Sequence, residues 1–216
     1  MRKNYKKNLF IGIGLIIGFI IWTILLCFID LNPIGPLNSI VGFSTMNCYI
    51  HELFGSNMFL YYLTDFLSLY PLIIVLLFMI LGIVQLIKFK SFLKVDHKIL
   101  LLGVFYIIVF IIFILFEFID INCRPMLIEG KLETSYPSST TMLVICVTGT
   151  SIIHFNDYIK NNKLKKLNIF GNILFIIFMI LCRMISGVHW FTDIIGALLL
   201  SIGLIEIYLF FYKKIN

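Results

Sequence analysis

The sequence predicts an all-α membrane protein, a six-span transmembrane helical bundle with its N-terminus and C-terminus in the cytoplasm. Three observations predict this fold class. Of the 216 residues, 61% are hydrophobic and 13% are charged, with a mean hydropathy of +1.05, whereas a soluble domain carries about 25% charged residues. The apolar residues form long runs, and most basic residues lie between alternate runs. We therefore expect one integral membrane domain over residues 1–216.

Six apolar runs reach or approach the roughly 20 helical residues that cross about 30 Å of hydrocarbon. Because lipid cannot satisfy backbone hydrogen bonds, we expect every run to be helical. The first run follows basic residues but is too long for a signal peptide and lacks a cleavage site, so we expect it to remain uncleaved. The fourth and fifth runs are short and must borrow flanking residues. The predicted spans are Leu9–Ile29, Leu67–Ile87, Ile99–Ile119, Thr140–Phe155, Leu167–Leu181 and Ile194–Tyr212.

The basic residues predict the orientation, because cytoplasmic connections are enriched in Lys and Arg. With the N-terminus inside, 14 of the 17 basic residues are cytoplasmic: residues 2, 3, 6, 7, 88, 90, 94, 98, 160, 163, 165, 166, 213 and 214. Only Arg124, Lys131 and Arg183 remain outside. The predicted outer segments are 30–65, 120–139 and 183–193.

Composition also excludes some function classes. The net charge of +6 does not indicate nucleic-acid binding, because no basic face is interleaved with stacking aromatic residues. The five cysteines form no CxxC pair, and no histidine stands at metal-ligand spacing, so we expect neither a metal nor a cofactor. Cys123 and Cys182 each precede an outer arginine. We expect both near the same site, without a disulfide between them.

The last outer segment carries the strongest candidate for chemistry. Arg183 precedes His189 by six residues, and Asp193 follows His189 by four. At that spacing, a carboxylate and an imidazole share one helical face, and the carboxylate can select the imidazole tautomer. Nucleophilic and general-base catalysis both need such an oriented imidazole, and Gly187 permits a tight turn before it. The alternative is a His and an Asp that only cap the helix at the membrane interface.

The segment Arg183-Met-Ile-Ser-Gly-Val-His189-Trp-Phe-Thr-Asp193 resembles the third motif of the PAP2 superfamily, the type 2 phosphatidic acid phosphatases and their relatives. That motif reads Ser-Arg, five residues, His, three residues and Asp. Pro137-Ser138-Ser139-Thr140 stands where the family has Pro-Ser-Gly-His, and Arg124-Pro125 resembles the end of the first motif. The resemblance covers about residues 60–212, and all three segments fall on the predicted outer side.

The resemblance implies a role for each matching residue. His189 would attack phosphorus and become a phosphohistidine, and Asp193 would orient it. Guanidinium groups suit bidentate binding of phosphoryl oxygens, and hydroxyl and N–H groups at a helix start also bind them. The residues expected to bind these oxygens are Arg124, Arg183, Ser138 and Ser139.

Two positions depart from the family pattern. The second-motif His, implied as the acid that protonates the leaving group, is Thr140 here, and a Thr hydroxyl does not titrate near neutral pH. The first-motif Lys is Glu117, whose ionised carboxylate would repel a phosphate. Three residues are candidates to compensate for these two departures: Glu117 as an acid, His51 from the first outer segment, and Lys131 through its positive charge. The alternative for each is a solvated or snorkelling residue.

The resemblance implies a hydrolase of lipid phosphates or lipid diphosphates, working at the outer surface of the cell membrane. The expected partners are that lipid and the bilayer. Two alternatives stay open: a non-catalytic relative that binds lipid phosphate, and a phosphotransferase of the same fold. The sequence names neither the lipid nor the oligomeric state. Without a leaving-group acid, we expect diphosphates to be preferred, because a phosphate monoester with a second pKa of about 6 leaves with little help.

Overall fold

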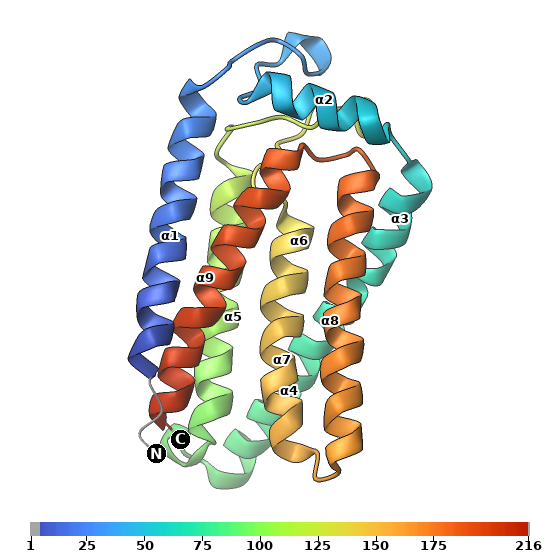
Figure 1. Cartoon of the computed structure of the whole chain (residues 1–216). Helices are drawn as coiled ribbons and strands as arrows, with labels where there is room; N and C mark the ends of the chain where they lie inside the picture. Colours follow the sequence, from blue (N-terminus) through green and yellow to red (C-terminus); the bar gives the residue numbers. More distant parts are fainter. Residues whose placement is uncertain (1–4, 216) are drawn as a thin grey trace.

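The computed structural model describes residues 5–215 and is all-helical over that range, with no extended strand (Figure 1). The helices are α1 (Tyr5–Phe28), α2 (Ser44–Phe54), α3 (Met58–Leu67), α4 (Leu69–Phe89), α5 (His97–Glu117), α6 (Ser139–Leu143), α7 (Gly149–Tyr158), α8 (Asn162–Ile185) and α9 (Phe191–Ile215). Two short 3₁₀ turns, η1 (Pro36–Asn38) and η2 (Phe92–Lys94), and the π-helical segment η3 (Val144–Thr148) complete the chain. The predicted all-α class is confirmed.

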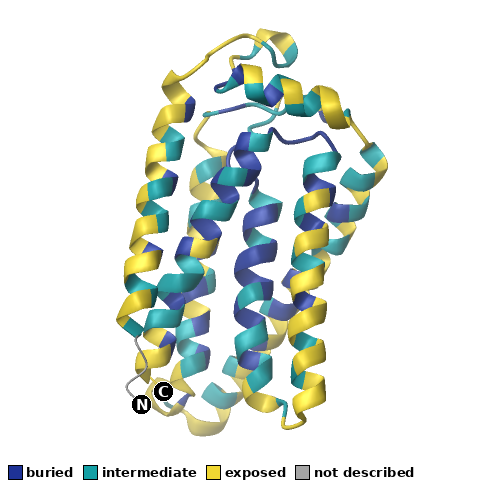
Figure 2. Cartoon of the chain, viewed as in Figure 1, coloured by how far each residue is buried: buried dark blue, intermediate teal, exposed yellow. Residues whose placement is uncertain are grey.

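Five helical stretches within residues 5–215 are long and apolar enough to cross a membrane, namely α1, the combined α3–α4 stretch Met58–Phe89, α5, α8 and α9. The predicted fourth span, Thr140–Phe155, is not among them. It falls on α6, η3 and α7, which continue one another through the middle of the bundle (Figure 1). Figure 2 shows this column as the most buried part of the bundle. Since protein surrounds much of it, the column carries polar side chains that a lipid-facing helix would avoid.

The bundle is held together by an apolar core to which α1, α4, α5, α6, η3 and α9 contribute, and its outward faces expose many Ile, Leu and Phe side chains. Such exposure is typical of surfaces covered by lipid. Helix α1 packs along α9, and small residues permit the close approach. A Cβ at Gly12 would lie 2.7 Å from Cγ1 of Ile207, and one at Gly203 would lie 2.9 Å from Cδ1 of Ile16.

The two ends of the bundle differ in content. The ends of the described chain and the α4–α5 and α7–α8 connections lie at one end, and α2 crosses the other (Figure 1). Of the basic residues counted as cytoplasmic, Arg2 and Lys3 lie outside the described residues. Helix α2 was not predicted, because it is short and stands in a segment of mixed polarity. A residue outside the helix stabilises its first turn, since Oδ2 of Asp30 accepts a hydrogen bond from the Thr45 amide at 2.7 Å.

Candidate active site

A short turn between α8 and α9 carries His189. Its conformation depends on Gly187, which has a φ of 68° and packs so closely that a Cβ would lie 2.3 Å from the carbonyl oxygen of Gly55. The amide of Asn57 donates to the carbonyl of Ser186 at 2.9 Å and fixes the same turn. Since α9 begins after His189, the expectation of one helical face shared with Asp193 is wrong.

The imidazole of His189 is oriented mainly by a backbone carbonyl. Its Nδ1 lies 3.1 Å from the carbonyl oxygen of Ser135 and 3.6 Å from Oδ2 of Asp193. The expected hydrogen bond to Asp193 is therefore absent, because Oδ2 instead accepts from the Trp190 amide at 2.9 Å, as an acidic residue does in a capping box. A carbonyl oxygen only accepts hydrogen bonds, so Nδ1 carries the proton and Nε2 carries the lone pair.

The Nε2 atom of His189 is the unprotonated end of this ring. It is buried and has no hydrogen-bond partner within residues 5–215. Burial lowers the pKa of His189 well below its ordinary value, and the positive charges of Arg124 and Arg183 lower this pKa further. The side chain is thus neutral at neutral pH, with a nucleophilic nitrogen available for reaction.

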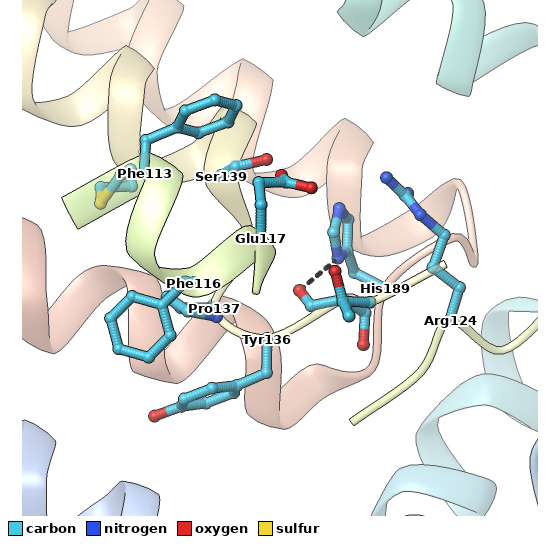
Figure 3. Close-up of a pocket in the computed structure, with 11 residues that line it drawn as sticks. Phe113, Phe116, Glu117, Arg124, Tyr136, Pro137, Ser139 and His189 are labelled. Atoms are coloured by element: carbon cyan, nitrogen blue, oxygen red, sulfur yellow. Dashed lines mark hydrogen bonds between the residues drawn. The ribbon is translucent and has the colours of Figure 1, made fainter. Parts of the chain in front are cut away.

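Four residues from the three motif segments line one small pocket, shown in Figure 3: Glu117, Arg124, Ser139 and His189. They come from the end of α5, the 118–138 loop, the start of α6 and the α8–α9 turn. Phe113, Phe116 and Met142 form apolar parts of the same lining. A polar site beside apolar side chains at one end of a bundle suits an amphipathic molecule with a charged head.

Arg124 brings a cation to this pocket. Its amide donates to the carbonyl of Glu133 at 2.9 Å, and its Nε lies 3.0 Å from Oε2 of the Glu133 side chain. Its Nη1 is buried and makes no hydrogen bond within residues 5–215. A buried guanidinium N–H without an acceptor is costly, so this atom is suited to bind an anionic oxygen.

Arg183 is not among the residues that line this pocket. It is held by α3, which was not predicted to contribute. Its Nη1 donates to Oγ1 of Thr64 and pairs with Oδ1 of Asp65, each at 3.0 Å. Its Nη2 donates to Oγ1 of Thr140 at 2.7 Å, and the guanidinium carbon stands 5.0 Å from the ring centre of Tyr61. Three elements, α3, α6 and α8, therefore meet at this one cation.

The two serines of the segment that resembles the second motif, Ser138 and Ser139, differ in what they face. Ser138 is fully buried, and its Oγ donates to Oγ1 of Thr141 at 2.9 Å, while its amide donates to the carbonyl of Asp193 at 3.2 Å. Ser139 instead lines the pocket. Ser138 thus joins the start of α6 to α9, and Ser139 offers its hydroxyl to the site.

Comparison with known proteins agrees with the motif resemblance. The sequence model of the PAP2 superfamily matches residues 117–216. The resemblance to this superfamily is thus confirmed over residues 117–216. The solved structures include a transmembrane PAP2-type phosphatidylglycerolphosphate phosphatase from Bacillus subtilis, which has 18% identity and a TM-score of 0.56 over 94% of each chain. This match shows that the two share a fold. No curated protein matches the chain.

The other candidates do not line the pocket of the candidate site. The ring of His51 packs 5.5 Å from that of Trp190, and Lys131 stands exposed in a turn. Cys123 and Cys182 are free thiols, and burial raises the pKa of Cys123. Within residues 5–215, no three His, Cys, Asp or Glu side chains gather as metal ligands do.

Two contributors to the candidate site could not be predicted from the sequence. The carbonyl of Ser135 orients His189, and a backbone acceptor leaves no trace in the identity of its residue. Asp65 pairs with Arg183 from α3, more than 100 residues away along the chain. One indication for Asp65 is present in the sequence, namely that it is an acidic residue close to the start of a predicted span.

Proposed function

We propose that this PAP2 protein is a membrane phosphatase that transfers a phosphoryl group from a lipid phosphate or diphosphate to His189 and then to water. The observation that carries the proposal is the state of His189. Its Nδ1 is hydrogen-bonded to the Ser135 carbonyl, and its Nε2 is buried without a partner within residues 5–215. His189 also lines one pocket together with Arg124 and Ser139. Phosphoryl transfer depends mainly on positioning and charge stabilisation, and these groups provide both.

The roles of the remaining residues follow from their contacts. Arg124 binds the phosphoryl oxygens directly, and Arg183 adds positive charge from behind, linked through Thr140. Asp193 stabilises the turn that carries His189 and, at 3.6 Å, the charge that develops on the imidazole. Ser139 and the amide groups at the start of α6 donate to the same oxygens, and Ser138 holds that helix start against α9.

We also propose six spans, with the termini in the cytoplasm and the site on the outer side. The column of α6, η3 and α7 covers residues 139–158, which is about 30 Å of helix at 1.5 Å per residue. The basic clusters 88–98 and 160–166 border the connections at the end opposite α2, which supports a cytoplasmic position for that end (Figure 1). A site at the outer end, beside the phenylalanines of α5, favours a substrate anchored in the membrane.

A binding protein without turnover is the second candidate, and Thr140 is the observation that favours it. The hydroxyl of Thr140 is engaged by Arg183 and does not titrate near neutral pH. A site of this kind binds a lipid phosphate but lacks the family's acid at this position.

Phosphate release by purified protein from a panel of lipid mono- and diphosphates separates the two candidates. We expect release by the native protein and by His51→Gln, a matched histidine outside the pocket, and none by His189→Gln. Brief exposure to labelled substrate should also leave an acid-labile, alkali-stable phosphohistidine that His189→Gln lacks. Lipid-phosphate binding without release by the native protein would refute turnover and support the binding role.

A further inference from the structure

The pocket around His189 contains one carboxylic acid among its lining residues, Glu117. It is the last residue of α5, and in Figure 3 its carboxyl group points toward the space bounded by His189, Arg124 and Ser139. The lining also includes Tyr136, but the hydroxyl of Tyr136 bonds to Oγ1 of Thr23 at 2.7 Å. Glu117 therefore carries the one carboxyl group in the lining that could hand a proton to a bound substrate or take one from it.

The proposed reaction needs a proton donor that the motif residues do not supply. A lipid monophosphate expels a strongly basic alkoxide, and a positioned acid accelerates such a step by roughly 10²–10⁴-fold. The hydroxyl of Thr140 does not titrate in this range, and it already accepts from Arg183 at 2.7 Å. Arg124 and Arg183 remain protonated, since a guanidinium holds its proton throughout this range. The lining leaves the carboxyl group of Glu117 for this task.

We propose that Glu117 is the acid that protonates the leaving group and the base that then activates water, an assignment that rests on the proposed function. In the first step, Nε2 of His189 forms a bond to phosphorus as the bond to the lipid oxygen breaks. The proton of the Glu117 carboxyl group passes to that oxygen, and the lipid alcohol departs. In the second step, the Glu117 carboxylate takes a proton from water as the water oxygen bonds to phosphorus and the nitrogen–phosphorus bond breaks. Phosphate departs, and both residues regain their starting states.

The charges around Glu117 are consistent with this cycle. Arg124 and His189 face it from two other segments, and Glu133 pairs with Arg124. Arg124 lies in the same lining and offers a positive charge to an incoming phosphate, which offsets the acidic residue at the position of the family's Lys. Once the proton is given up, the negative carboxylate lies near Arg124, which stabilises it until water is activated.

The test compares Glu117→Gln with Glu133→Gln on two substrates, a lipid monophosphate and a lipid diphosphate with the same chain. Both variants remove one carboxylate near Arg124, but Glu133 does not line the pocket. For Glu117→Gln we expect a loss of roughly 10²–10⁴-fold on the monophosphate. The loss on the diphosphate should be much smaller, because its leaving group needs little protonation. Glu133→Gln should change both rates by the same factor, and Glu117→Asp should retain part of the monophosphate activity.

Each outcome bears on a separate claim. Equal losses on both substrates, or faster turnover of both by Glu117→Gln, would overturn the role of Glu117 while leaving a working phosphatase. Thermal unfolding of each variant in detergent shows whether a loss reflects misfolding, and partial rescue by Glu117→Asp supports acid–base chemistry over packing. Native protein that turns over neither substrate would overturn the proposed function itself, and this assignment with it.

Discussion

Replacing Gly187 by Ala tests whether the turn between α8 and α9 positions His189, the proposed nucleophile. Gly187 has a φ of 68°, and an L-residue in the left-handed region costs roughly 1–2 kcal/mol. The added Cβ would lie 2.3 Å from the Gly55 carbonyl oxygen and 2.9 Å from Cα of Ser56, where ordinary contact begins at 3.4 Å. Both neighbours are backbone atoms, so one segment must move by about 1 Å, at a further cost of roughly 1–3 kcal/mol. We expect a loss of about 2–5 kcal/mol in stability.

The same displacement should affect catalysis, because His189 lies two residues after Gly187. A misplacement of about 1 Å costs roughly 10²-fold in rate. Gly130→Ala is the matched control, since Gly130 has a φ of 75° but no atom within 4 Å of its added Cβ. It should show only the conformational cost of about 1–2 kcal/mol and near-native turnover. Phosphate release and thermal unfolding in detergent measure both effects, and equal behaviour of the two variants would refute the reasoning.

Three further predictions concern protonation, the leaving group and topology. The pKa of His189 is held below its ordinary value of 6.5, so the stability that the neutral, buried ring contributes is fully present above pH 6.5 and declines below it, by up to about 1.4 kcal/mol per pH unit. The difference between the unfolding temperatures at pH 7.5 and pH 5.5 should therefore be smaller in His189→Gln than in the native protein. The same difference in both proteins would contradict the burial argument. Thr140→His should raise monophosphate hydrolysis more than diphosphate hydrolysis, most clearly when Glu117 is Gln, and equal gains in parallel assays would disprove the leaving-group argument. An impermeant thiol reagent added to intact cells should label a single Cys at Lys131 but not one at Lys163, and the reverse pattern would invert the proposed orientation.

Much of the fold was predictable because its signals are local. Membrane-spanning helices must bury an apolar surface and satisfy their own backbone, so long runs identify α1, α4, α5, α8 and α9. The same rule explains why the central column of α6, η3 and α7 is less apolar than the other predicted spans. Its residues include Thr148, Thr150 and Ser151, all fully buried in protein, and a helix shielded from lipid need not be apolar. Helix α2 escaped prediction for a related reason, since a short helix across the end of a bundle leaves no long apolar run.

The sequence by itself singled out the candidate site residues, because Arg183, His189 and Asp193 stand in one short segment at a spacing that chance seldom produces. Only the tertiary structure decided which contacts they make. The atom that orients His189 belongs to Ser135, 54 residues earlier, and a partner of Arg183 is Thr64, 119 residues earlier. It also placed Glu117 in the pocket, at a position where the sequence alone suggested a charge that would repel phosphate. Local spacing carries the identity of the residues, but contacts between distant segments are made only when the helices pack, and the state of each reactive atom depends on those contacts.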